Sequence, residues 1–260
     1  MKKLVVAVAA VVLGALVVTA VAGAGEPSNT EGDHVILQVN VSPPRVSTAT
    51  RPQPVGVVFD SREYTDNGQR STHPTRTNAF RFNGFSFHPK PFAKCRESKL
   101  EKQGPSGCPA GSRLGKGYAI VDARPTLADP LRANAQAFNG ILDVDSAGKP
   151  ITPVPAVLIF AKTAGGLTAY VPALFKGSDG IITEDRGQSA QSPYTLTTVH
   201  LSIAPKTTKV SGKTVGFLEA PRACKGGLWN FSETDRFITA VGNPPSNVRI
   251  SRDTQPCVKR

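Results

Sequence analysis

Histidine is the side chain best suited to general acid–base catalysis near neutral pH, because its ordinary pKa lies close to that range. The chain has four histidines, His34, His73, His88 and His200, and none stands in an H-x-H or H-E-x-x-H pattern. Scattered histidines in a β-rich chain usually have structural roles. We therefore assign no catalytic histidine, and each of the four stays open only as a single candidate base.

Nucleophilic hydrolysis would need an activated serine, and the chain contains no G-x-S-x-G nucleophile elbow. Ser112 ends the string C-P-A-G-S, which has the wrong spacing, and no strand-to-helix turn is predicted there. Neighbouring carboxylates occur at Asp143 and Asp145 and at Glu184 and Asp185. Sequence neighbours seldom lie across a sugar bond as glycosidases require, so we interpret both pairs as surface turns. No catalytic residue is predicted.

Metal binding has one weak candidate. Residues 143–148 (DVDSAG) faintly resemble a calcium loop, but Ala147 stands at the third ligand position and Val154 at the twelfth position of the loop. A zinc site would need cysteines or histidines at short spacing, such as C-x-x-C, and the sequence has none. We therefore predict no metal and no cofactor, and we interpret residues 143–148 as a hairpin turn.

The four cysteines, Cys95, Cys108, Cys224 and Cys257, predict two disulfides. Of the three possible pairings we favour the one between sequence neighbours, Cys95 with Cys108 and Cys224 with Cys257. The first bridge would close a loop that contains the turn formers GPSG, and the second would tie the C-terminal end to an earlier strand. Loop-closure entropy gives about 3 and about 4 kcal/mol for the two bridges.

The N-terminal segment has the pattern of a secretion signal. Lys2 and Lys3 precede an uncharged apolar run, and small residues in A-x-A order follow it. We expect residues 1–24 to be a signal peptide that is cleaved after Ala22 or Ala24. The alternative is an uncleaved anchor, since the run is just long enough to span a bilayer. No second such run exists, so we expect a secreted or cell-surface protein whose mature part has no transmembrane span.

The net charge is +12 at pH 7, and the excess of basic residues is spread without a run of five or six. A diffuse positive field favours weak, salt-sensitive attraction to anionic polymers of a cell envelope. The alternative is that the charge only keeps a secreted protein dispersed. No specific nucleic-acid motif is present, and the partners stay unknown.

Short β-branched and aromatic runs separated by turn residues predict about ten strands and no long helix. The runs lie at residues 34–41, 55–59, 78–88, 117–123, 134–144, 154–161, 167–175, 194–204, 215–219, 228–241 and 248–251. This pattern fits a two-sheet sandwich or a barrel. We favour a single all-β sandwich domain, Ig-like or jelly-roll-like, over residues 34–260, after a flexible leader at residues 25–33.

Aromatic residues gather in two of these runs. Five phenylalanines lie close to basic residues, and a tryptophan lies in the penultimate run: Phe80, Phe82, Phe85, Phe87, Phe92 and Trp229. Their alternation around residues 83–84 predicts a bulge or tight hairpin with one core-facing side. The alternative is a surface on which bases or sugars stack.

Three strings carry a family resemblance: CPAGSRLGKGYA at residues 108–119, AFNG at 137–140 and APRAC at 220–224, followed by Trp229 and a late Cys257. Over roughly residues 35–258 the chain resembles uncharacterised secreted proteins of high-GC Gram-positive bacteria. The resemblance implies export, β structure and local disulfide pairing, and it implies no activity. The glycines of C-P-x-G-S-x-x-G-x-G suit a tight turn that enters a strand, with backbone geometry that glycine adopts freely.

These observations predict an exported, non-catalytic structural or binding module at or outside the cell envelope. One alternative is a secreted hydrolase for carbohydrate or ester substrates, whose site is assembled from residues distant in sequence. A deep polar cleft with His88 or His200 beside a carboxylate would favour it. The other alternative is a basic polyanion-binding surface protein, which a flat basic face with exposed aromatic residues would favour.

Overall fold

The computed structural model describes residues 32–67, 75–122, 129–145, 149–184, 195–237 and 247–259, which all belong to one compact unit, Glu31–Arg260. The expected signal peptide and most of the expected leader lie outside the described residues. So do His73, Asp185 and residues 146–148 of the calcium-like string.

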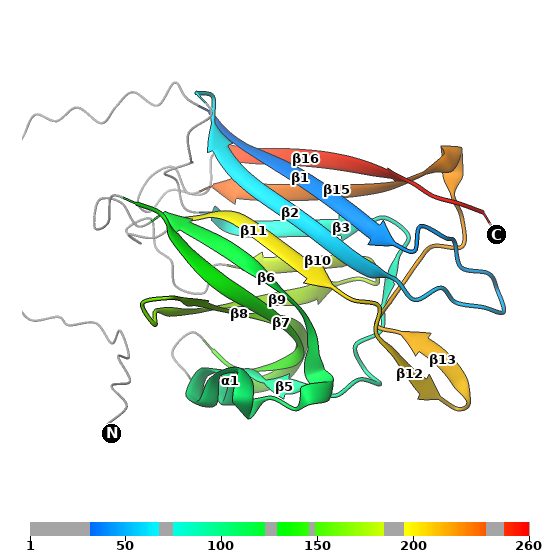
Figure 1. Ribbon diagram of the computed structural model, residues 1–260, viewed down its shortest axis with the longest axis horizontal. Coiled ribbons are helices and arrows are strands. Elements are labelled where there is room, and N and C mark those ends of the chain that lie inside the picture. Colours follow the sequence, from blue (N-terminus) through cyan, green and yellow to red (C-terminus); the bar gives the residue numbers. More distant parts are fainter. Residues whose placement is uncertain are drawn as a thin grey trace, which may run out of the picture. The chain divides into compact units, whose positions relative to one another are not determined.

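One antiparallel sheet of eleven strands dominates the fold, with one short parallel strand added at its side (Figure 1). Its strands are β1 (Asp33–Ser42), β2 (Gly56–Thr65), β3 (Thr75–Phe82), β6 (Arg113–Asp122), β7 (Leu131–Val144), β8 (Pro150–Thr163), β9 (Thr168–Lys176), β10 (Gly180–Glu184), β11 (Thr195–Ile203), β15 (Leu228–Phe237) and β16 (Asn247–Pro256). They follow the order β1-β2-β11-β6-β7-β8-β9-β10-β3-β15-β16, and the two end strands contact each other. The sheet is therefore a near-closed barrel.

The seam between β1 and β16 is held by side chains instead of a backbone ladder. The β1 amides of Leu37 and Val39 donate to Ser251 Oγ at 2.9 Å and to Asp253 Oδ2 at 2.6 Å. Gln255 closes the far end of the seam by binding a β1 amide through Oε1 and the carbonyl oxygen of the same residue through Nε2. Alternate β16 side chains thus satisfy backbone groups of β1 that have no ladder partner on this side.

The expected all-β class and both expected disulfides, Cys95–Cys108 and Cys224–Cys257, are confirmed. The expected two-sheet sandwich is not clearly present, because one sheet curls round until its ends meet. Register shifts in β11, β6 and β7 interrupt the ladders, and such bulges bend and twist strands. The unexpected strand β10 also bridges β9 and β3, so no break divides the sheet into two.

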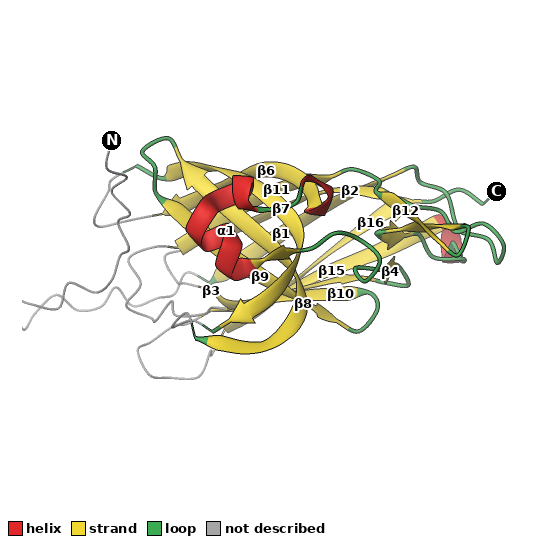
Figure 2. Ribbon diagram, turned by 90° about the horizontal axis from the view of Figure 1, so that it is seen from below, coloured by secondary structure: helices red, strands yellow, loops and turns green. Residues whose placement is uncertain are grey.

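Smaller elements decorate the barrel. They are β4 (Ser86–Phe87), β5 (Cys95–Arg96), β12 (Thr207–Val210), β13 (Lys213–Gly216), β14 (Leu218–Glu219), the helix α1 (Glu97–Gln103) and the 3₁₀ turns η1 (Gly104–Gly107), η2 (Ala110–Ser112) and η3 (Lys225–Gly227). Figure 2 shows α1 across the outside of the barrel, where its Leu100 packs with Phe138 of β7 in a second apolar cluster. The sequence analysis missed this helix, which is only seven residues long.

The glycines of the C-P-x-G-S-x-x-G-x-G string have a different role from the one predicted. Gly115 and Gly117 lie inside β6, and neither has a positive φ. A Cβ atom at Gly117 would lie 1.8 Å from the carbonyl oxygen of His200, and one at Gly115 would lie 2.1 Å from that of Ser202. Close approach of β11 therefore requires these glycines, not a left-handed turn.

The interior of the barrel has an aromatic end, where β1 and β3 finish and β2 and β15 begin. We define it by the buried rings of Phe82, Phe85, Phe217, Trp229 and Phe231. Neighbouring rings meet edge-on or tilted, for example Phe85 with Trp229 at 5.0 Å between centroids. The interpretation of the aromatic residues as core is confirmed: only Phe87 is partly exposed, and it packs against the same cluster.

Candidate ligand site inside the barrel

Two strands carry carboxyl groups into the barrel. On β15 the residues that alternate with solvent-facing positions are Trp229 and Phe231, then Glu233 and Asp235. On β2 the inward series that begins with valine and phenylalanine continues to Glu63. Because successive side chains of a strand point to opposite faces, the alternation alone places these carboxyls on the core face. The sequence analysis did not use this pattern and missed all three residues.

We call Glu63, Glu233 and Asp235 the acidic cluster. Glu233 and Asp235 are 0% exposed and Glu63 is 4% exposed, so the cluster is enclosed as fully as the aromatic end. Its members come from strands that are not neighbours in the sheet, and they meet across the interior because the barrel closes through β1 and β16. The cluster lies toward the end where β2 and β15 finish.

One oxygen of each carboxyl group is hydrogen-bonded. Glu63 Oε1 accepts the hydroxyl of Thr75 at 2.6 Å, and Glu233 Oε1 accepts that of Ser61 at 2.7 Å. The side-chain amide of Asn78 donates to Asp235 Oδ1 at 3.0 Å. The second oxygen of each carboxyl is also buried. Glu63 Oε2 receives no hydrogen bond from a protein donor, whereas Glu233 and Asp235 hydrogen-bond to each other through a carboxyl proton. No described lysine or arginine forms an ion pair with the cluster.

Burial determines the protonation of the acidic cluster. It raises the pKa of Glu63 and of Glu233 well above the ordinary value, and the nearby Asp235 carboxylate raises both further. Burial also raises the pKa of Asp235 to about 7, against hydrogen bonds from Asn78 and from protonated Glu233. The carboxyl groups of the cluster therefore keep their protons to higher pH than exposed carboxyls do, and Glu233 shares its proton with Asp235.

A cavity of about 80 Å³ lies beside the cluster inside the barrel. Glu63 and Glu233 line it, together with the polar side chains of Ser61, Asn78 and Thr197. The rest of the wall is apolar and includes Phe59, Phe80, Ala119, Ile159, Val171 and Val199. At about 30 Å³ for each water molecule, the space holds roughly two or three waters or a short organic group.

Small side chains make room for this cavity. Ala119, Ala135 and Ala161 are buried on β6, β7 and β8, and all three line it. The aromatic end fills the corresponding space with phenylalanine rings. Apolar walls with a few convergent polar groups and perturbed carboxyls are the usual composition of a small-molecule site.

The cluster is not arranged as a metal centre. In the part of the chain that the structure describes, no group of three His, Cys, Asp or Glu side chains is placed to hold a metal ion. The carboxyl groups inside the barrel can form hydrogen bonds and charge pairs against an apolar wall.

His34, His88 and His200, the histidines that the structure describes, lie at the outer surface. His200 Nδ1 is 2.6 Å from Asp60 Oδ1, and its ring stacks on Tyr118, over which the Arg132 guanidinium lies 3.7 Å from the ring centroid. His34 pairs with a neighbouring aspartate. None of the described serine or threonine hydroxyls hydrogen-bonds to His200. The hydrogen bond with Asp60 orients the His200 ring, but among the described residues no nucleophilic hydroxyl is paired with that ring.

His88 forms the other histidine–carboxylate pair. Its Nε2 is 3.4 Å from Glu219 Oε2. The residue lines a shallow, mostly apolar surface hollow together with Phe87 and Val154. This is not the deep polar cleft that would favour a hydrolase.

The remaining sequence candidates have structural contacts. Ser112 is fully buried, and its hydroxyl donates to a backbone carbonyl three residues earlier. Asp143 is not part of a surface turn as expected: it is buried and accepts the backbone N–H and hydroxyl of Ser98, which fixes the first turn of α1. Asp145 accepts a backbone N–H within its turn, as expected. Asp185 lies outside the described residues.

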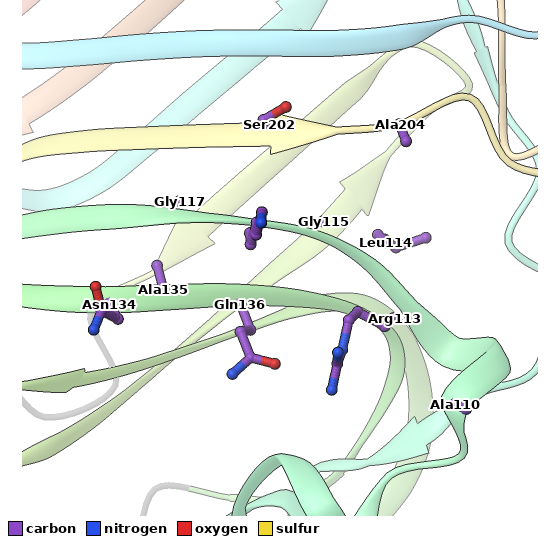
Figure 3. A pocket seen from close by; sticks show the side chains of 11 residues that line it. Ala110, Arg113, Leu114, Gly115, Gly117, Asn134, Ala135, Gln136, Ser202 and Ala204 are labelled. Carbon is purple, nitrogen blue, oxygen red and sulfur yellow. The ribbon is translucent and has the colours of Figure 1, made fainter.

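A groove on the outer surface lies between β6, β7, β11 and the η2 turn (Figure 3). Its volume is about 740 Å³, and Arg113 and Gln136 point into it. A second hollow of about 600 Å³ shares Asn134 and Gln136 with it and continues past Lys162 toward α1. The two hollows form one groove, which we call the outer groove.

No protein-family model matches the chain, and no curated protein matches it. Two disulfides indicate an extracellular or otherwise oxidising environment. Within the described residues, none of the helices has the length and apolar character needed to cross a membrane.

Proposed function

We propose that this protein is an exported, non-catalytic binding module and that its ligand site is the cavity inside the barrel. The observation that carries the proposal is the buried oxygen Glu63 Oε2, which has no donor from the protein and belongs to a residue that lines a largely apolar space beside the proton-sharing pair of Glu233 and Asp235. Buried polar atoms are almost always hydrogen-bonded in folded proteins, so such an oxygen calls for a partner supplied from outside the chain.

The energetic cost of the acidic cluster supports a functional role. An unpaired buried carboxyl group costs on the order of 1–3 kcal/mol, and apolar replacements of buried charges are often neutral or stabilising. Stability alone therefore favours an apolar residue at Glu63 and Glu233. Strongly shifted carboxyls that line a cavity are typical of binding and catalytic sites.

The scaffold supports binding because its walls are pre-organised. Nearly every wall strand of the cavity is paired on both sides by backbone ladders, and the aromatic end closes the interior below it. A site built on paired strands keeps its side chains more precisely placed than a site on loops.

Xenon tests whether the cavity admits a ligand, because it enters small apolar cavities without needing polar contacts. We expect xenon to shift the amide NMR signals of Ala119, Ala161 and Val199. The cavity-filling variant Ala161→Leu should abolish these shifts, whereas Ala223→Leu at an exposed position should preserve them. Unchanged signals at all three positions in the unmodified protein would overturn the proposal.

The outer groove favours a second candidate function, the binding of anionic envelope polymers. Arg113 and Lys116 line one part of it and Lys162 another, and its floor offers the amides of Asn134 and Gln136. Cationic side chains around an open groove attract polyanions with strong salt dependence. The diffuse positive charge of the sequence had already suggested weak attraction to such polymers.

The test compares two pairs of lysines. Lys116→Gln with Lys162→Gln should weaken polyphosphate binding at low salt and reduce its salt dependence. Lys209→Gln with Lys213→Gln removes the same charge from the separate β12–β13 hairpin. Equal weakening by both double variants would show that only net charge matters and would reject the groove as a site.

A further inference from the structure

We propose that the ligand of the barrel cavity carries a primary ammonium group on a short apolar body, and that Glu63 and Glu233 hold the nitrogen. This inference rests on the proposed function, since it names the chemical class that the cavity binds. Its two observations are the buried carboxyl groups that line the cavity, of which Glu63 has an oxygen without a protein donor, and the apolar remainder of the wall.

The polar atoms of the cavity match an ammonium group in number and kind. Glu63 Oε2 is an acceptor without a protein donor, and Glu233 becomes an acceptor when the proton that it shares with Asp235 leaves. The hydroxyl of Ser61, which also lines the cavity, donates to Glu233 and keeps acceptor capacity of its own. A primary ammonium has three N–H donors and no acceptor, so it complements these groups.

The acidic groups around the cavity favour a cation over an anion. Glu63 on β2, Glu233 and Asp235 on β15 and Asp33 on β1 are all acidic and buried at this end of the barrel. On β3, Thr75 and Asn78 hydrogen-bond to the cluster through neutral polar side chains. Each of these carboxyls that ionises would repel a negatively charged ligand and attract a cation, and in a poorly solvated space such charge interactions are strong.

Arg249 of β16, a described cation near this end, makes its contacts elsewhere. Its guanidinium donates through Nε to the backbone carbonyl of Asp33 at the rim, and it acts electrostatically on the exposed Asp66. It does not appear among the groups that shift the pKa of Glu63, Glu233 or Asp235. The cluster thus lacks a cationic partner from the described chain.

Size and wall chemistry select a primary over a quaternary ammonium. The cavity of about 80 Å³ is near half of the roughly 150 Å³ that accommodates benzene in an engineered cavity, so it fits about three or four non-hydrogen atoms. Carboxyl acceptors bind N–H donors, whereas a quaternary ammonium offers none and is recognised by aromatic cages. Phe59 and Phe80 form only one tilted pair, with ring centroids 5.3 Å apart.

Ammonium binding must exchange with carboxyl protons. In the free protein burial favours the protonated form of these carboxyls, whereas a bound cation would favour the ionised form. Entry of R–NH₃⁺ therefore releases a proton to solvent, and the net charge in the cavity stays constant. Affinity should rise with pH until the carboxyl groups ionise in the free protein.

The experiment is an NMR titration of the full chain with propylammonium, 1-propanol, propionate and tetramethylammonium. We expect propylammonium to shift the amides of Ala119 and Ala161, and to bind about tenfold more tightly at pH 7.5 than at pH 5.5. The other three probes should bind at least tenfold more weakly at pH 7.5.

Two variants and one control complete the test. Glu63→Gln and Glu233→Gln keep side-chain size and should each weaken propylammonium binding at least tenfold. Asp60→Asn removes a carboxylate from the outer face of the same strand as Glu63 and should leave it unchanged. Circular dichroism verifies that each variant folds.

Failure of this inference is distinguishable from failure of the proposed function. If xenon enters but 1-propanol binds as tightly as propylammonium, or if both Gln variants bind normally, the ammonium assignment is wrong and the cavity remains a site. If xenon does not enter either, the proposed function itself fails.

Discussion

The two ends of the barrel interior are built by the same strands with the same alternation, yet they have opposite chemistry. On β15, Trp229 and Phe231 lie at the aromatic end, and Glu233 and Asp235 continue the same inward series toward the other end. The ends therefore differ only in which side chains occupy equivalent positions. Packing of aromatic rings at one end stabilises the fold, whereas burial of carboxyl groups at the other end reduces its stability.

Energies support this division. Each buried phenylalanine contributes about 1.5–3 kcal/mol, and an aromatic pair adds about 0.5–1.5 kcal/mol. The polar exception at the aromatic end is Trp229 Nε1, a neutral N–H for which the structure shows no acceptor. At the acidic cluster, the ionisable oxygen Glu63 Oε2 lacks a protein donor instead, which opposes folding.

The largest expected effect is the difference in stability loss between a mutation at the aromatic end and a mutation at the acidic cluster. Phe231→Ala leaves a cavity among the packed rings and should reduce the free energy of unfolding by about 3–5 kcal/mol. Glu233→Gln keeps the size of the side chain and removes an unfavourable ionisation, so it should change this free energy by less than about 1 kcal/mol at pH 6. Urea denaturation measures both. Comparable losses would mean that the acidic cluster belongs to the folding core.

The pH dependence of stability tests the acidic cluster directly. The Asp235 carboxyl in the unfolded chain loses its proton near 3.8, whereas in the folded protein it keeps it up to about 7. Between these values the folded state binds more protons, so this group makes stability fall as pH rises, by on the order of 4 kcal/mol in total. The raised pKa values of Glu63 and Glu233 act in the same direction.

Urea denaturation at pH 4.5, 6 and 7.5 measures this fall. Asp235→Asn should flatten the curve between pH 4.5 and 7.5, and Asp60→Asn at the outer surface should not. A curve that is unchanged in Asp235→Asn would show that the cluster does not retain its protons in the folded state.

The alternation in β15 predicts the orientation of Glu233 and Asp235 from sequence alone, because the two share the phase of Trp229 and Phe231. The proximity of Glu233 and Asp235 to Glu63 cannot be predicted from this alternation. It depends on closure of the barrel, which brings together strands that are neither sequence neighbours nor sheet neighbours. Local patterns contain no information about such closure.

The missed elements have a similar explanation. The helix α1 is stabilised by the distant Asp143 carboxylate and by the Cys95–Cys108 bridge, not by its own short sequence. The strand β10 has five residues and is defined by its partners β9 and β3. The disulfide pairing and most strands followed from composition and alternation, which are local properties.

The next effect in size concerns the disulfide beside the aromatic end. Cys224→Ser with Cys257→Ser opens a loop of 33 residues in sequence separation and should reduce the free energy of unfolding by about 3–4 kcal/mol. Both cysteines pack against the aromatic core and not against the cavity. Xenon-induced shifts at Ala119 should therefore persist in this variant. Their loss would show that the two ends are not independent.

The smallest effect is a gradient of hydrogen exchange along the β1–β16 seam, which runs from the acidic end to the aromatic end. Ser251 gives Leu37 a single hydrogen bond, whereas Gln255 binds both the N–H and the carbonyl of Val41. Since a hydrogen bond contributes about 1 kcal/mol net, the amide of Leu37 should exchange several-fold faster than that of Val41.

The variant Gln255→Ala isolates the cause of this gradient. It removes both bonds to Val41 and should raise the exchange rate of that amide about tenfold or more, while Leu37 stays unchanged. If Val41 remains protected without Gln255, packing at the aromatic end closes the seam and the side-chain ladder is secondary. If Leu37 responds equally, the seam opens as a unit, and the two ends of the barrel are coupled through it.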